Sequence, residues 1–174
     1  MQSNYSMSLL LNQPTSLLRR WSLAALVYTF VWLLGYWTLT NWRYAYPERW
    51  LMLAGSMLLV AMTILGSNLR HNRRGEHGPL LPTLGYGNGL TLTRGLLLLL
   101  LTGFLFSPRP AAPLTWVPAI LFTASRLIDC FDGYVARITR HDTKLGAILD
   151  IEFDGLDLLV AVLLGVQYGV LPVW

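Results

Sequence analysis

Carboxylate side chains gather in one part of this 174-residue chain, where they stand among apolar residues. Seven of its nine acidic residues fall between positions 129 and 157, and they are Asp129, Asp132, Asp142, Asp150, Glu152, Asp154 and Asp157. Ionisable groups are costly inside an apolar membrane helix, and those that persist there mark functional sites. This segment is therefore the first candidate for chemistry.

The spacing of these residues predicts two helical faces that carry the carboxylates. With a period of about 3.6 residues, the first face holds Asp129, Asp132, Gly133, Ala136 and Arg137. The second face holds Gly146, Asp150, Asp154 and Asp157, whereas Glu152 points away from it. Because only the short connection 138–144 separates the two segments, we expect antiparallel neighbouring helices whose carboxylates face each other.

Four of these carboxylates suggest a metal site, and they are Asp129, Asp132, Asp150 and Asp154. Like charges at short range cannot all stay ionised without compensation. Mg²⁺ and Mn²⁺ are hard cations that prefer oxygen ligands, and two such ions would balance four carboxylates. A pair of divalent ions is suited to displacement reactions at phosphorus. The alternative is a polar helix pair that is solvated at the membrane surface.

The complete pattern reads Asp129-x2-Asp132-Gly133-x2-Ala136-Arg137-x8-Gly146-x3-Asp150-x3-Asp154. It resembles the signature of the CDP-alcohol phosphotransferase (CDP-alcohol phosphatidyltransferase) family at every fixed position. An earlier run, Asn88-Gly89-Leu90-Thr91-Leu92-Thr93-Arg94, is similar to the opening of that family's first core helix, with Gly87 in place of a proline. The alternative interpretation of Asn88 and Thr91 is that they cap a helix.

The resemblance implies an integral membrane enzyme of phospholipid synthesis that acts as a homodimer. Such enzymes transfer a substituted phosphoryl group, commonly phosphatidyl, from a CDP-linked donor such as CDP-diacylglycerol to an alcohol, and they release CMP. By position, the resemblance implies that two Mg²⁺ or Mn²⁺ ions are bound by Asp129, Asp132, Asp150 and Asp154. It implies that Asp154 is also the catalytic base. It assigns contacts with the CDP part of the donor to Asn88, Thr91, Gly133, Arg137 and Thr143.

The elements that must position these residues are apolar enough for a membrane. Hydrophobic residues make up 54% of the chain and charged residues 13%, against about 25% charged in globular proteins. Seven Trp and eight Tyr fit rings placed at a lipid–water boundary. A spanning helix needs about 20 residues, and the apolar runs are 21–42, 50–69, 90–106, 113–137 and 145 to about 167–171. The sequence therefore predicts an all-α integral membrane protein with about five transmembrane helices, the last three resembling the first half of the family's core.

Basic residues predict the orientation of these helices. With the N-terminus inside, nine Lys and Arg residues lie on the cytoplasmic side and three lie outside, as the positive-inside rule favours. The acidic site would then lie at the cytoplasmic face of a membrane, which we expect to be a bacterial inner membrane. Because the basic residues are scattered between apolar runs, they indicate a lipid bilayer as the partner and no nucleic acid.

The chain divides into an N-terminal segment with two transmembrane helices (1–69), a cytoplasmic linker (70–87) and the family-like core (88–174). The family core has six membrane helices and only three runs follow Asn88, so we expect this core to be incomplete at its C-terminus. A truncated or inactive protein of the same fold, which binds nucleotide or lipid, is the main alternative to an enzyme. An ion transporter is a further alternative, although transport does not call for the spacing of Gly133, Arg137 and Gly146. Arg126 is either a substrate contact or a structural partner of an aspartate.

Overall fold

The computed structural model describes residues 15–75, 78–138 and 143–172, while the side chains of residues 15, 86 and 132–138 lie outside the description. Five long helices follow one another in these ranges: α2 (Thr15–Asn41), α3 (Pro47–Asn68), α4 (Gly85–Thr102), α5 (Val117–Ile138) and α6 (Lys144–Gln167). Short 3₁₀ turns cover Leu69–His71 and Leu114–Trp116. The β structure in the described ranges is an isolated bridge between Arg73 and Leu80.

These helices confirm the prediction of an all-α membrane protein. Among the described residues, three stretches are long and apolar enough to cross a membrane: Ser16–Asn41, Pro47–His71 and Leu114–Phe131. Each of the five predicted runs corresponds to one helix, although the third ends at Thr102 and not at residue 106. That all five helices span the bilayer stays a prediction.

Large apolar side chains cover the outer surface of α2. Leu26 and Phe30 are each 66% exposed, and Trp37 is 64% exposed. Contiguous apolar surface of this kind drives association in water, whereas lipid tails solvate it as well as another helix would. The outer face of α2 is therefore suited to contact with lipid.

Backbone chemistry explains where α3 begins and where α6 ends. Pro47 lies in the first turn of α3, where its missing N–H would have no helical partner in any case. Gly169 follows α6 with a φ of +69°, a left-handed conformation that glycine adopts without a steric penalty. The N–H groups of Val170 and Leu171 then donate to the Gly165 carbonyl at 2.8 and 3.0 Å, which closes the end of α6.

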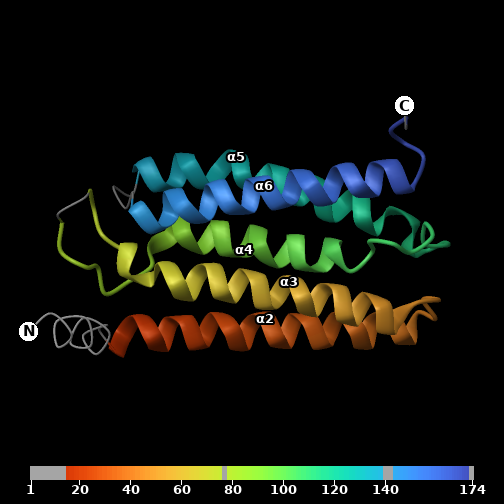
Figure 1. Ribbon diagram of the computed structural model, residues 1–174, viewed down its shortest axis with the longest axis horizontal. Helices are drawn as coiled ribbons and strands as arrows, with labels where there is room; N and C mark the ends of the chain where they lie inside the picture. Colours follow the sequence, from red (N-terminus) through yellow and green to blue (C-terminus); the bar gives the residue numbers. More distant parts are fainter. Residues whose placement is uncertain (1–14, 76–77, 139–142, 173–174) are drawn as a thin grey trace, which may run out of the picture.

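Helix α4 is the central element of the bundle. It packs against α3 on one side and against both α5 and α6 on the other, and α2 lies beyond α3 (Figure 1). Helices α5 and α6 run antiparallel, as the sequence predicts (Figure 1). However, the main packing partner of each is α4. The two carboxylate-bearing helices are therefore positioned by a third helix, α4.

Polar groups of aromatic side chains connect the two N-terminal helices to each other and to α4. Each donates to a backbone carbonyl of a neighbouring helix: Trp21 to Met62 at 3.0 Å, Trp32 to Leu51 at 2.9 Å, Trp50 to Leu100 at 3.2 Å and Tyr28 to Leu92 at 2.5 Å. Glycine makes room for two of the rings, since a Cβ at Gly55 would press on Trp32 and one at Gly103 would collide with Trp50. These four rings therefore stabilise helix packing. The sequence had suggested a different role for Trp and Tyr rings, at the lipid–water boundary.

Candidate functional site

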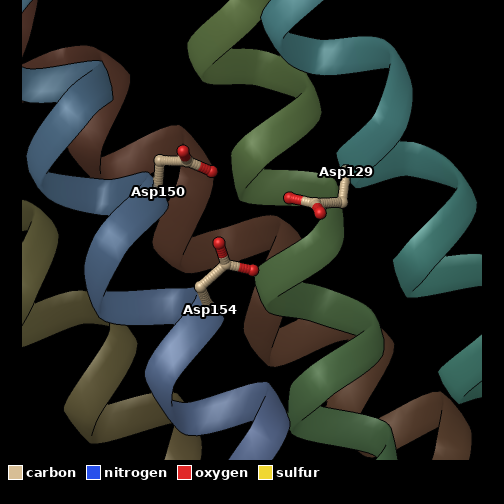
Figure 2. Close-up of side chains that lie close together, drawn as sticks. All are labelled: Asp129, Asp150 and Asp154. Atoms are coloured by element: carbon tan, nitrogen blue, oxygen red, sulfur yellow. The ribbon is translucent and has the colours of Figure 1, made fainter.

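Three carboxylates from two helices converge on one point. Asp129 comes from α5, and Asp150 and Asp154 come from successive turns of α6; in Figure 2 the three side chains extend into the space between the helices. One oxygen of each carboxylate lies within 4.8 Å of the other two. The side chains are 26%, 46% and 44% exposed, so the cluster is accessible from outside the bundle. The structure thus brings together three of the four aspartates that the sequence singles out for metal.

The first turn of α6 determines where Asp150 and Asp154 lie relative to α4. Thr143 caps this turn, because its Oγ1 accepts a hydrogen bond from the Gly146 N–H at 3.0 Å. The Asn88 side-chain amide of α4 donates to the same oxygen at 3.1 Å. A Cβ on Gly146 would collide with Oδ1 of Asn88, so a larger residue here would force the Asn88 side chain to move. Two residues far apart in the sequence thereby fix the register between α4 and α6.

The residues expected to contact CDP fall into two groups. Asn88, Thr91 and Thr143 are buried, and Thr91 Oγ1 donates back to the Gly87 carbonyl at 3.1 Å. The other two, Gly133 and Arg137, belong to α5 together with the predicted metal ligand Asp132, but the side chains of this segment lie outside the described residues. Contact of any of these residues with a nucleotide stays a prediction.

Arg94 of α4 is the central cation of the cluster. Its side chain has no solvent exposure. Nη2 donates to Oδ1 and to the backbone carbonyl of Asp150 at 2.9 and 3.0 Å. Nη1 forms an ion pair with Asp129 and lies 3.5 Å from Oδ1 of Asp154. One buried guanidinium therefore links all three converging carboxylates.

Arg126 of α5 is a second cation, and it bridges to α6. Its Nη2 donates to Asp154 at 2.9 Å and to Asp157 at 2.7 Å, and its Nη1 lies 3.5 Å from Asp129. Asp157 is completely buried and also accepts a hydrogen bond from Ser125 Oγ at 2.9 Å. Of the two roles considered for Arg126, the structure thus shows the structural one, as a partner of aspartates.

The charges of the described site do not balance. Four carboxylates, those of Asp129, Asp150, Asp154 and Asp157, face the guanidinium groups of Arg94 and Arg126 and leave a formal charge of −2. The three partly exposed carboxylates supply only oxygen donors, the set that Mg²⁺ and Mn²⁺ prefer. The residues therefore fit a divalent metal ion, which would compensate the remaining negative charge.

The sequence analysis assigned no role in the site to Arg94 or Asp157, although a feature of the sequence pointed to each of them. Arg94 is the only charged residue in the described helix α4, and an isolated charge in an apolar helix indicates a buried partner. Asp157 shares the helical face of Asp150 and Asp154. The partners of Arg94 were not predictable from the sequence, because Arg94 and Asp150 lie 56 positions apart.

Comparison with known proteins agrees with this geometry. A model of the CDP-alcohol phosphatidyltransferase family matches residues 85–174, which form more than half of the chain and include α4, α5 and α6. A CDP-diacylglycerol–glycerol-3-phosphate 3-phosphatidyltransferase of Cereibacter sphaeroides is 34% identical over 71 residues. That alignment covers 41% of this chain but only 31% of the relative. No solved structure matches the chain significantly.

The family match and the structure place the same residues together. The matched region contains every aspartate of the cluster and the arginine that links them. The family resemblance inferred from the aspartate spacing is thus confirmed over the part of the chain that builds the site. The chain belongs to the CDP-alcohol phosphatidyltransferase family.

Proposed function

We propose that the protein transfers a phosphatidyl group from CDP-diacylglycerol to an alcohol and releases CMP, as an enzyme of membrane phospholipid synthesis. The observation that carries the proposal is the convergence of Asp129, Asp150 and Asp154 within the region matched by the family. The name of the Cereibacter relative suggests glycerol 3-phosphate as the first acceptor to test. Because the chain spans 31% of that relative, donor, acceptor and activity all belong to the proposal.

In this proposal, Asp129, Asp150 and Asp154, with Asp132, hold two Mg²⁺ or Mn²⁺ ions. When bound, the ions supply positive charge for the phosphoryl oxygens and the departing CMP. The residues themselves set the geometry: Asp129 reaches in from α5, and the capped first turn of α6 presents Asp150 and Asp154. Arg137 would offer its guanidinium to the diphosphate, and Asn88, Thr91, Gly133 and Thr143 would shape the nucleotide end of the site.

Asp154 is the proposed general base. An alcohol that attacks phosphorus must lose its proton, and a positioned carboxylate commonly contributes about 10²–10⁴ in rate. Asp154 is 44% exposed, and its Oδ1 is held by Arg126 at 2.9 Å. The carboxylate is therefore both accessible to an alcohol and fixed in orientation.

The site in this proposal faces the cytoplasm, and the protein acts as a homodimer. The carboxylate cluster lies toward the end of the bundle that also carries Arg70, Arg73 and Lys144, where the Lys144 N–H donates to the Arg73 carbonyl at 3.1 Å. Excess Lys and Arg on one side of a membrane protein favours the cytoplasmic side.

In this proposal residues 1–69 are the N-terminal segment, residues 70–87 the linker and residues 88–174 the core.

The test is CMP release by the purified chain in lipid nanodiscs. CDP-diacylglycerol is supplied with Mg²⁺ or Mn²⁺ and with one of several alcohols, glycerol 3-phosphate first. We expect metal-dependent CMP release that Asp129→Asn abolishes and Glu152→Gln preserves, because Glu152 is exposed and outside the cluster. Binding of CDP-diacylglycerol without turnover for any alcohol would instead support the alternative, an inactive protein of this fold.

A further inference from the structure

Arg94 stands at an unusual place for a permanent charge. Its side chain is fully buried, yet it comes from an apolar helix and reaches the three carboxylates that we propose bind metal. Arginine does not lose its proton in proteins, so this guanidinium carries its charge under all ordinary conditions. The site therefore contains a cation whether or not a metal ion is bound.

This cation is one of two that hold the cluster together, the other being Arg126. Arg94 Nη2 bonds both the side chain and the backbone carbonyl of Asp150, and Nη1 pairs with Asp129 on the other helix. Without a positive charge between them, carboxylates from α5 and α6 would repel each other in a partly desolvated space. Because α5 and α6 pack mainly against α4, a charge carried by α4 is well placed to hold them both.

We propose that Arg94 is a built-in cation of the metal site, which keeps the carboxylates assembled without metal and weakens the metal that binds. The proposal rests on the proposed function, since it concerns the divalent ion expected there. The two effects have one origin, because the charge that attracts Asp129 and Asp150 also repels a divalent ion held by the same oxygens. Arg94 is thus a positioning residue that acts through the aspartates.

The proposal predicts that loss of this charge lowers the stability of the metal-free protein and raises its affinity for metal. Arg94→Gln should lower the thermal unfolding temperature of the metal-free protein. It should also tighten Mn²⁺ binding by at least about tenfold, because even a screened repulsion at this range exceeds the energy of one tenfold step. Arg94→Lys keeps the charge but loses the planar fork of donors, so its Mn²⁺ affinity should remain near the wild type while its unfolding temperature falls part of the way.

The experiment measures Mn²⁺ binding by electron paramagnetic resonance and thermal unfolding with and without Mn²⁺, on the whole chain in nanodiscs. Arg49→Gln is the matched control, since Arg49 is an exposed arginine that donates to the Phe106 carbonyl and is not part of the cluster. This control should change neither the Mn²⁺ affinity nor the stabilisation that Mn²⁺ produces. If Arg94→Gln folds only with Mn²⁺, that result supports the proposal.

Each remaining outcome has a definite meaning. Unchanged or weaker Mn²⁺ binding to Arg94→Gln, or an equal loss of stability with and without Mn²⁺, would overturn the proposal and leave the metal site intact. If Arg94→Gln does not fold under any condition, Arg94→Lys decides, and a tenfold change in its Mn²⁺ affinity would contradict a role based on charge. A wild type that binds no Mn²⁺ would refute the metal site itself, and this inference with it.

Discussion

At the scale of single residues, the aspartates of the site differ in how far they are buried and in how many hydrogen bonds their negative charge receives. Asp157 is fully buried, and its Oδ2 accepts hydrogen bonds from both Ser125 and Arg126. Asp154, one turn earlier, is 44% exposed and shares the Arg126 guanidinium. A buried, multiply bonded carboxylate is suited to holding helices together, and an exposed one is suited to meeting a substrate. The two neighbours should therefore respond differently to the loss of charge.

Asp154→Asn should separate chemistry from binding. Removing the proposed base should lower the single-turnover rate by about 10²–10⁴, whereas donor affinity should change little because Asp129 and Asp150 remain. Asp129→Asn should instead weaken donor binding and turnover together. Donor affinity and single-turnover rate are measured for both variants. If Asp154→Asn lost only affinity and kept its rate once the donor was bound, Asp154 would be a ligand and not the base.

Asp157→Asn should mainly reduce stability. Replacing the buried carboxylate by an amide removes the negative charge that lies closest to Arg126, at 2.7 Å, and breaking a buried ion pair costs about 3 kcal/mol. Part of Arg126 is exposed, so solvent will recover some of that loss. The measurement is the unfolding free energy in detergent, with Glu152→Gln as the exposed control, which should stay within about 0.5 kcal/mol. Equal effects of the two substitutions would contradict a structural role for Asp157.

At the scale of elements, the site depends on a close approach of the first turns of α4 and α6. Asn88, Thr143 and Gly146 form this contact, and none of them belongs to the converging carboxylates. The contact sets the register between α4 and α6. It thereby determines which part of α6, with Asp150, lies beside Arg94. A small change at this end should therefore be transmitted along α6 to the acidic cluster.

Gly146→Ala should show this transmission. Its new Cβ would collide with Asn88 Oδ1, and overpacking of this kind costs about 1–3 kcal/mol. The matched control is Gly155→Ala in the same helix, where nothing lies within 4 Å of the added atom. Alanine in place of an unconstrained helical glycine is favourable by about 0.5–1 kcal/mol. Unfolding free energies should therefore move in opposite directions, and a shared direction would argue against the contact as described.

At the scale of the whole molecule, the two N-terminal helices are part of the bundle and not a separate anchor. Helix α3 packs along α4, and the Trp50 and Tyr28 side chains bond to carbonyls of α4. Arg20 also donates to the Pro82 carbonyl at 3.2 Å, which connects α2 to the segment before α4. The orientation of the bundle in the membrane therefore applies to the N-terminal helices and the site together.

Cysteine labelling should reveal that orientation. Lys144 and Ala111 are both exposed, and they lie at opposite ends of the bundle. In a Cys130→Ser background, which removes the natural exposed thiol, Lys144→Cys should resist an impermeant thiol reagent in intact cells. Ala111→Cys should react with it. The reverse pattern would place the carboxylate cluster on the outer side of the membrane.

The sequence by itself determined much of the helical organisation and the family. Apolar runs and a period near 3.6 residues are local properties, so they indicated five helices and placed Asp150 and Asp154 on one face. The spacing from Asp129 to Asp154 was specific enough to indicate the family that the comparisons confirm. Helix ends were less accurate, because the residues that end a helix depend on capping contacts as well as on hydropathy.

Only the tertiary structure decided what stands between the carboxylates. Periodicity predicted two facing helices, but both pack mainly against α4, which contributes the buried guanidinium of Arg94. Likewise, Trp32 and Trp50 bond to carbonyls of neighbouring helices where composition suggested rings at the lipid boundary. The physical reason is the same in both cases. A helix records in its own sequence which face is apolar, but its partner across that face is set by packing between residues far apart in the chain.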